Sequence, residues 1–138
     1  MGEPLEYPLR VRFGECDPQG VVFNAHYLAW FDISLTELWR AAFGSYQSAL
    51  NRGWDVMVAE ANLRYLSPAR FDDELRMAIS VGQLGTTSLH THHRVWRGEE
   101  LLVEGSLRHV WVDTDSYRKS PIPASAREAF APWTVDRG

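Results

Sequence analysis

Residues 13–32 read FGECDPQGVVFNAHYLAWFD, a turn-rich loop with one acidic pair that runs directly into a strongly apolar segment. Pro18 and Gly20 are turn residues, and Asn24 is of a type that can cap a helix. Apolar residues then recur with helical spacing until Gly44, a residue type that ends helices. A helix that is apolar over so much of its circumference needs partners on several sides, so we expect other elements to wrap around it.

The remaining chain supplies these partners as five segments in which apolar and polar residues alternate. They cover residues 7–13, about 55–66, 75–82, 88–97 and 101–112, and tight turns join the last four. Two apolar faces are predicted, one with Leu9, Val11 and Phe13, the other with Met57, Ala59, Ala61, Leu63 and Tyr65. The order predicts an α+β fold, an antiparallel five-stranded sheet wrapped around one long central helix, with a short helix over residues 124–131.

Composition narrows the class of protein. A chain of 138 residues is long enough for one domain, here 1–138, and a hydrophobic share of 45% is ample for a packed core. The net charge of -4 argues against a nucleic-acid partner, and Cys16, as the one cysteine, excludes an internal disulfide.

Without a secretion-signal profile or an apolar run of about 20 residues, we expect a cytoplasmic protein with no membrane partner. The exposed edges of a single curved sheet predict at least a dimer.

The run from Phe13 to Phe23, followed by Tyr27 and the triplet 30–32, resembles the signature of the 4-hydroxybenzoyl-CoA thioesterase family of hotdog-fold acyl-CoA thioesterases. A second match covers residues 65–75, and the expected order of elements agrees from residue 7 to about residue 123. The resemblance implies a hotdog fold and hydrolysis of a thioester of coenzyme A or an acyl carrier protein, without a cofactor, in a homodimer or homotetramer. One departure is the turn 85–88, Gly-Thr-Thr-Ser, where some relatives carry basic residues.

By its position in the motif, Asp17 is similar to the family's catalytic carboxylate, and the backbone amide of Asn24 to the group that polarises the thioester carbonyl. A carboxylate that assists water or attacks directly, with helix amino-terminal amides facing the developing oxyanion, is sufficient for this chemistry. An Asp-Pro turn and a capping Asn are the plain structural alternatives for these two residues. The predicted substrate-binding residues are Gly20, Val21, His26, Tyr27, Glu60, Asn62, Arg118 and Lys119.

Several rival chemistries have weaker support. Cys16 lies between two acids, which disfavour its thiolate, and no Gly-x-Ser-x-Gly elbow indicates a serine hydrolase. His90, His92 and His93 lack carboxylate or thiol partners at ligand spacing, so no metal is expected. The abundance of Trp and Phe on the helix and after it suggests an aromatic or short- to medium-chain acyl group, with core packing as the alternative. A hotdog hydratase or dehydratase and a non-catalytic acyl-CoA-binding protein remain the alternative functions.

Overall fold

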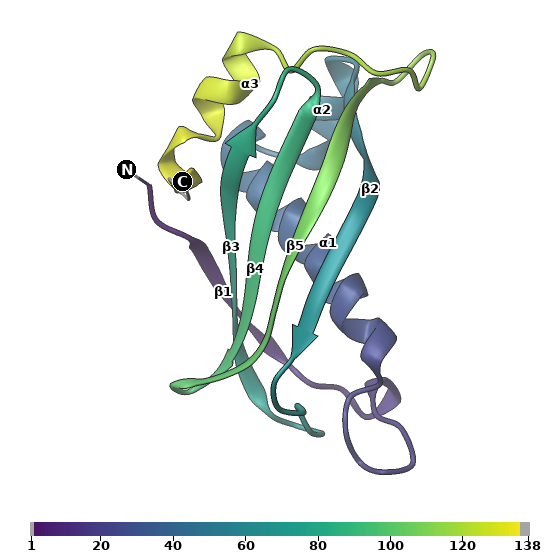
Figure 1. Ribbon diagram of the computed structural model, residues 1–138, viewed down its shortest axis with the longest axis vertical. Helices are drawn as coiled ribbons and strands as arrows, with labels where there is room; N and C mark the ends of the chain where they lie inside the picture. Colours follow the sequence, from purple (N-terminus) through teal and green to yellow (C-terminus); the bar gives the residue numbers. More distant parts are fainter. Residues whose placement is uncertain (1, 136–138) are drawn as a thin grey trace.

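The structure is a computed structural model that describes residues 2–135. Five strands in the order β1-β3-β4-β5-β2, all antiparallel, form one sheet, and the long helix α1 lies against one of its faces (Figure 1). This confirms the predicted α+β arrangement of a five-stranded sheet around a central helix. In chain order the elements are β1 (Leu5–Arg10), α1 (Asn24–Phe43), α2 (Tyr46–Asn51), β2 (Trp54–Tyr65), β3 (Glu74–Leu84), β4 (Ser88–Arg97), β5 (Glu100–Asp113) and α3 (Ala124–Ala129), with 3-10 turns at Phe13–Glu15 and Ala131–Trp133.

The core divides along α1 into two clusters. One surrounds the amino-terminal half of the helix, including Trp30 and Phe31. The other surrounds its carboxyl-terminal half, where Trp39 stacks on Trp111 with ring centroids 5.4 Å apart. Trp30 and Trp39 are fully buried, so packing accounts for these aromatic residues. The end of the molecule near Trp39 is a dense aromatic core, and the other end carries the loop before α1 (Figure 1).

The first strand ends earlier than the sequence predicted. Leu9 and Val11 are buried as expected, but β1 stops at Arg10 and Phe13 is 78% exposed in a 3-10 turn. The reason lies in Glu15, whose Oε1 accepts a hydrogen bond from the amide of Arg12 at 2.7 Å and bends the chain out of the sheet. The predicted apolar face of this strand was therefore wrong at its last position.

The second strand also departs from the predicted alternation. Its pairing with β5 shifts register between Val58 and Glu60. A bulge of this kind exchanges the two faces of a strand, because side chains alternate with a period of two. Met57 and Ala59 are consequently exposed, although they were predicted on the buried face. Leu63 packs against the core as predicted, but Ala61 and Tyr65, on the same side of the strand, are exposed.

A short helix, α2, was missed because the polar segment after Gly44 offers little apolar periodicity. Ser45 caps it, since the amide of Ser48 donates to its hydroxyl at 2.9 Å. Within residues 2–135, no helix is both long and apolar enough to cross a membrane.

Candidate active site

The loop before α1 is a small hairpin closed by backbone bonds. Cys16 and Val22 form an isolated antiparallel bridge, and the amide of Asp17 donates to the carbonyl of Val21 at 2.9 Å. Gly20 donates back to the Asp17 carbonyl at 2.9 Å and has a φ of +81°, which an L side chain rarely adopts. Asp17 therefore lies on a defined turn.

The carboxylate of Asp17 is half-buried and only partly engaged. Its Oδ1 accepts a hydrogen bond from the amide of Gln19 at 2.9 Å. This Asx-type bond is the one expected if Asp17 serves to form an Asp-Pro turn. Its Oδ2 has no hydrogen-bond or ion-pair partner in the described part of the chain. One oxygen thus orients the carboxylate, and the other is available to a substrate or a water molecule.

Helix α1 begins directly after this hairpin, with Phe23 as its N-cap in an extended conformation (φ −67°, ψ 138°) and no side-chain cap. The expectation that Asn24 caps the helix is wrong, because Asn24 is already its first helical residue. Its backbone amide has no acceptor among residues 2–135, as expected for the first turn of a helix. The helix dipole adds positive potential at this amide, which suits a developing oxyanion.

Glu15 fixes the hairpin to the helix, a role that the sequence analysis missed. Its Oε2 accepts the indole N–H of Trp30 at 2.7 Å, and its backbone carbonyl accepts the amide of Phe23 at 3.0 Å. Its side chain is only 12% exposed. Because Glu15 lies two residues before Asp17 and Trp30 lies in the second turn of α1, these bonds hold the acid and the helix start in one unit. No local pattern around Glu15 indicated this role.

The loop between β2 and β3 supports the hairpin from the other side. Val22 donates its amide to the carbonyl of Ala69 at 2.9 Å, and Val21 pairs with Arg70. Tyr27 ties the same loop to the helix, since its hydroxyl accepts the amide of Ala69 at 3.1 Å. Tyr27 is 2% exposed, so its observed contacts are packing contacts and not those of a cavity wall.

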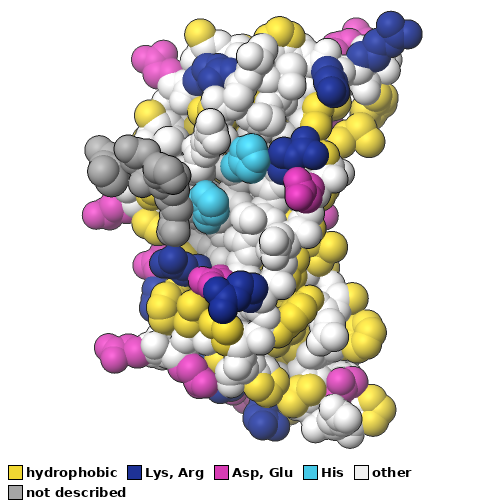
Figure 2. All heavy atoms as spheres, viewed as in Figure 1, with side chains coloured by type: hydrophobic (Ala, Val, Ile, Leu, Met, Phe, Trp, Pro, Cys, Tyr) yellow, Lys and Arg dark blue, Asp and Glu magenta, His cyan; other side chains and the backbone are white. Residues whose placement is uncertain are grey.

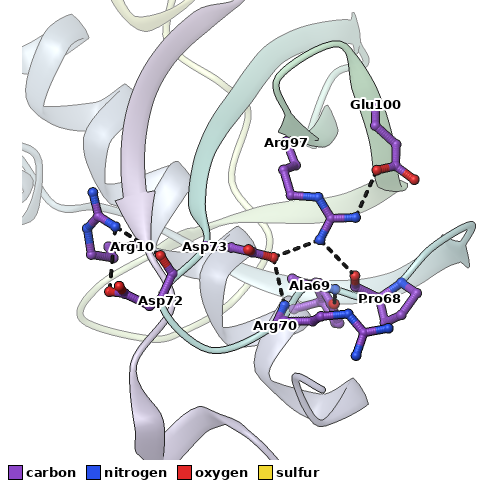
Figure 3. Close-up of polar contacts among 9 residues, drawn as sticks. Arg10, Pro68, Ala69, Arg70, Asp72, Asp73, Arg97 and Glu100 are labelled. Carbon is purple, nitrogen blue, oxygen red and sulfur yellow. Dashed lines mark hydrogen bonds and ion pairs between the residues drawn. The ribbon is translucent and has the colours of Figure 1, made fainter. Parts of the chain in front are cut away.

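Arg97 at the end of β4 holds this supporting loop in place (Figure 3). Its guanidinium donates to Asp73 Oδ2 at 2.7 Å, to the carbonyl of Pro68 at 3.3 Å and to Glu100 at 2.8 Å. The bonds to Glu100 and Asp73 raise the pKa of Arg97. Asp73 Oδ2 also accepts a hydrogen bond from the amide of Arg70 at 2.8 Å. Because Arg70 pairs with Val21, Arg97 is linked through Asp73 to the hairpin.

The other predicted substrate-binding residues lie at three places. Gly20 and Val21 are in the hairpin, and His26 is half-buried on the first turn of α1, where its ring forms an edge-to-face contact with Phe23. These groups therefore surround the helix start together with Asp17. Tyr65, which was predicted on the apolar face of the second strand, also reaches this point, since its hydroxyl lies 3.4 Å from the carbonyl of Asn24.

Glu60 and Asn62 lie on the opposite face of the sheet. Glu60 pairs with Arg108 at 3.3 Å, next to buried Leu107, so it points away from α1. That outer face is polar, with histidine and paired charges over its centre (Figure 2). Within one chain, Glu60 and Asn62 are not brought to the Asp17 hairpin.

Arg118 and Lys119 lie at the far end of the molecule. They are exposed in the loop after β5, where Lys119 bridges to Val112 and the carbonyl of Arg118 accepts the amide of Asp113. This is the end at which β2 starts, whereas the hairpin lies near the end at which β2 stops (Figure 1). One chain does not bring them near Asp17.

Buried histidines form a second polar group, inside the core. Thr91 Oγ1 lies 2.8 Å from His93 Nε2 and 3.1 Å from His109 Nε2. Burial lowers the pKa of His93 to about 3 and that of His109 to about 4, so both rings are neutral at pH 7. Among residues 2–135, no group of three or more His, Cys, Asp or Glu side chains is arranged to hold a metal ion.

Comparison with known proteins identifies the family of this chain. Residues 11–130 match the thioesterase-like superfamily. The chain is 30% identical over 127 residues to the acyl-CoA thioester hydrolase YbgC of Escherichia coli O6:H1, covering 91% of this chain and 95% of that protein. Among solved structures, the gentisyl-coenzyme A thioesterase BH1999 is 25% identical with a TM-score of 0.81, covering 92% of this chain and 99% of the other. A hypothetical protein from Aquifex aeolicus, AQ1494, has the same fold, with a TM-score of 0.86 at 23% identity and the same coverage.

Proposed function

Because this chain belongs to the thioesterase-like superfamily and is a thioester hydrolase, we propose that Asp17 is its catalytic carboxylate. In this proposal the Asn24 amide polarises the thioester carbonyl. The observation that carries the proposal is Oδ2 of Asp17, which has no partner among residues 2–135 and lies on a hairpin that leads directly into the first turn of α1. Both groups are held by the same anchor, Glu15.

The proposed reaction needs few groups, because a thioester is already reactive toward attack. Asp17 either takes a proton from an attacking water or attacks the carbonyl carbon itself. The carbonyl oxygen becomes negative next to the Asn24 amide, and the C–S bond then breaks to release the thiolate, which is protonated. If Asp17 attacks, water hydrolyses the resulting anhydride in a second step. Both routes use the same residue.

The substrate that we propose is an aromatic or a short- to medium-chain acyl-CoA. The acyl-CoA activity of the YbgC relative and the aromatic acyl group in the name of the gentisyl-coenzyme A thioesterase support this range. His26, Gly20 and Val21 surround the reacting carbonyl in this proposal. Arg118 and Lys119 remain candidates for the nucleotide phosphates, but their distant position requires them to act from a second subunit.

A homodimer or homotetramer fits the surface around the site. Large apolar side chains are exposed near the helix start, among them Phe23 at 52%, Tyr65 at 50% and Leu28 at 42%. β2 is also an edge strand, with Met57 and Val58 exposed. Exposed apolar side chains gathered along an unpaired edge are typical of a contact surface, so a second copy of the chain would cover them.

A thiol-release assay over benzoyl-CoA and straight-chain acyl-CoAs of several lengths tests the proposed function. We expect release of free coenzyme A from at least one of these thioesters, with a dependence on acyl length. Enoyl-CoA substrates in the same assay address the hydratase alternative, because hydration consumes the double bond without releasing thiol. Hydration without thiol release, or binding without any reaction, would reject the proposal.

A further inference from the structure

Three short chain segments at the site form an antiparallel ribbon. The bridge between Cys16 and Val22 joins the first segment to the second, and the bridge between Val21 and Arg70 joins the second to the third. Asp17 donates its amide to the carbonyl of Val21 at 2.9 Å, so it lies opposite that residue. Asp17, Val21 and Arg70 therefore form one row across the ribbon.

The two faces of the ribbon differ in environment. Directly opposite side chains of antiparallel segments lie on one face, and successive side chains along a segment alternate between the faces. The neighbours of the row pack in the core or against it, namely Cys16, Val22 and Ala69. Asp17 and Val21 are half-buried on the other face, and Arg70 is exposed there. The carboxylate proposed for catalysis and the Arg70 side chain thus share the open face of the ribbon.

Arg70 differs from the other arginines around the hairpin, because it has no anionic partner. Ion pairs with acids engage three of these arginines, namely Arg10, Arg12 and Arg97. Within residues 2–135 the guanidinium of Arg70 has no hydrogen-bond or ion-pair partner, and the bonds of this residue are made by its backbone (Figure 3). A guanidinium in this state is available to bind a phosphate through two of its N–H groups.

The row sets the distance between the two side chains. Neighbouring strands lie about 4.8 Å apart, so the backbones of Asp17 and Arg70 are about 10 Å apart. An arginine side chain adds up to roughly 6 Å at ordinary bond lengths. The extended pantetheine arm that carries a thioester in coenzyme A and in acyl carrier proteins spans roughly 16 Å from its sulfur to its phosphate at the same bond lengths. With the sulfur near Asp17, the phosphate therefore comes within reach of Arg70.

The open face also suits the direction in which the arm must run. A nucleotide or a carrier protein is larger than the site, so the arm leaves the helix start toward solvent. Any oligomer has to leave the face with Asp17 accessible to the thioester, and Arg70 belongs to the same face. Asp17 repels an anion, and Arg70 lies at the opposite end of the row, which keeps a bound phosphate away from the carboxylate.

We propose that Arg70 binds the phosphate of the phosphopantetheine arm and makes this phosphate a determinant of substrate affinity. The inference rests on the proposed function, because it takes Asp17 and the helix start as the position of the thioester. Both coenzyme A and acyl carrier proteins have this phosphate. Arg70 therefore acts on the carrier arm, whereas Arg118 and Lys119 are candidates for the nucleotide phosphates, which only coenzyme A has.

Binding of two thioethers that cannot be hydrolysed tests this inference. S-hexyl-4′-phosphopantetheine and S-hexyl-pantetheine differ only in the phosphate, and calorimetry measures their dissociation constants with the purified protein. The wild-type chain should bind the phosphorylated thioether about tenfold more tightly, the effect of a charge-assisted hydrogen bond. Arg70→Gln should reduce that ratio to below about two. Arg70→Lys keeps the charge but not the paired N–H groups, so its ratio should be intermediate.

Arg64→Gln is the matched control, because it removes the same charge from an exposed arginine near the end of β2, on the outer face of the sheet. Its ratio should equal that of the wild type. The Arg70 side chain is exposed and unpaired, so Arg70→Gln should leave the unfolding midpoint unchanged. Equal affinities of the wild type for the two thioethers would overturn the inference. A ratio that persists in Arg70→Gln, or that falls equally in Arg64→Gln, would do the same.

Two further probes identify the carrier that supplies the phosphate. S-hexyl-CoA and an acyl carrier protein that bears S-hexyl-phosphopantetheine are titrated into the wild type and into Arg70→Gln. A loss of affinity for S-hexyl-CoA alone assigns the phosphate to coenzyme A, and a loss for the loaded protein alone assigns it to the carrier protein. Unchanged affinity for both would contradict the assignment of Arg70.

Hydrolysis of hexanoyl-CoA and hexanoyl-pantetheine by the same preparations identifies which proposal has failed. If Arg70 binds the phosphate, Arg70→Gln raises KM for hexanoyl-CoA but not for hexanoyl-pantetheine, and kcat is unchanged. Turnover of hexanoyl-CoA with equal KM in both proteins contradicts the phosphate site and leaves the proposed function intact. A phosphate preference in binding without turnover of these thioesters or of benzoyl-CoA contradicts the catalytic proposal and supports the phosphate site.

Discussion

Trp30 donates its indole N–H to the carboxylate of Glu15 across 2.7 Å, and this bond joins the second turn of α1 to the hairpin that carries Asp17. The same carboxylate accepts the amide of Arg12. A hydrogen bond to a charged group that is largely shielded from water is among the stronger ones in proteins. The placement of the proposed catalytic carboxylate relative to the helix start therefore depends on a residue that takes no part in the chemistry.

Removing this anchor should reduce both stability and activity. We expect Glu15→Ala to lower the free energy of unfolding by about 2 kcal/mol, because it removes two hydrogen bonds to a charged acceptor. Turnover should fall at least tenfold, since Asp17 loses its fixed position. Urea denaturation and a thiol-release assay measure the two effects.

Trp30→Phe is the matched variant, because it deletes the indole donor and leaves Glu15 and its bond to the Arg12 amide in place. Turnover should change in the same direction as in Glu15→Ala, whereas the loss of stability also includes the cavity that the smaller ring leaves in the core. Full activity in both variants would show that the hairpin keeps its position without the bond.

Gly20 and Gly98 offer a controlled comparison of two turns. Both have positive φ, +81° and +60°, and an added Cβ would meet nothing within 4 Å at either. Replacing either by Ala should therefore cost a similar 1–2 kcal/mol of stability through the backbone alone. Only Gly20→Ala should lower kcat, because Gly98 lies in the hairpin between β4 and β5. Equal kcat for the two variants would exclude a catalytic role for the Gly20 turn.

The sequence predicted the fold well because the signals that define it are local. Alternation along each strand and the apolar stripe of α1 depend only on nearby residues. The bulge at Val58 and Glu60 arises from pairing with β5, so the alternation that placed Met57 on the buried face could not show it. The early end of β1 depends similarly on the side chain of Glu15.

The candidate site was predicted only in part, for a related reason. Asp17 and Asn24 are close in sequence, so their relation to the helix start could be read from the motif. Glu15 and Trp30 are separated by a loop, and their bond exists only once the hairpin folds. The distance of Arg118 and Lys119 from the hairpin follows from strand order, which no local pattern contains.

Arg97 should matter for the site although it lies outside it. Its bonds to Asp73 and Pro68 hold the loop that pairs with the hairpin (Figure 3). We expect Arg97→Gln to lower the free energy of unfolding by about 2 kcal/mol and to decrease kcat several-fold. Arg64→Gln is the control, since Arg64 pairs with Glu104 on the exposed outer face and should change stability by less than about 1 kcal/mol. Equal kcat for the two variants would contradict a supporting role for Arg97.

The buried histidines should make the fold sensitive to acid. The pKa of His93 is lowered to about 3 and that of His109 to about 4, both well below the ordinary value of 6.5. At pH values between these lowered pKa values and 6.5, the unfolded chain therefore binds more protons than the folded chain. Stability should therefore be complete above pH 6.5 and decrease as the pH falls toward 4. The slope should reach at most about 1.4 kcal/mol per pH unit for each ring.

Urea unfolding at pH 7.5, 6.5, 5.5 and 4.5 measures this slope. His93→Gln removes one of the two titrating rings and should reduce the slope by about half, whatever its stability at pH 7.5. A slope that is the same in both proteins would assign the acid sensitivity to other groups.

The turnover of Asp17→Asn tests the central claim most directly. Asparagine keeps the oxygen that accepts the amide of Gln19, so the hairpin should persist, but it can neither take a proton from water nor attack the carbonyl. Asp115→Asn, an exposed change at the far end of the molecule, is the control. We predict that Asp17→Asn loses at least 100-fold in kcat on a thioester that the wild type hydrolyses well, with an unchanged unfolding midpoint. Near-normal turnover in Asp17→Asn would contradict the account.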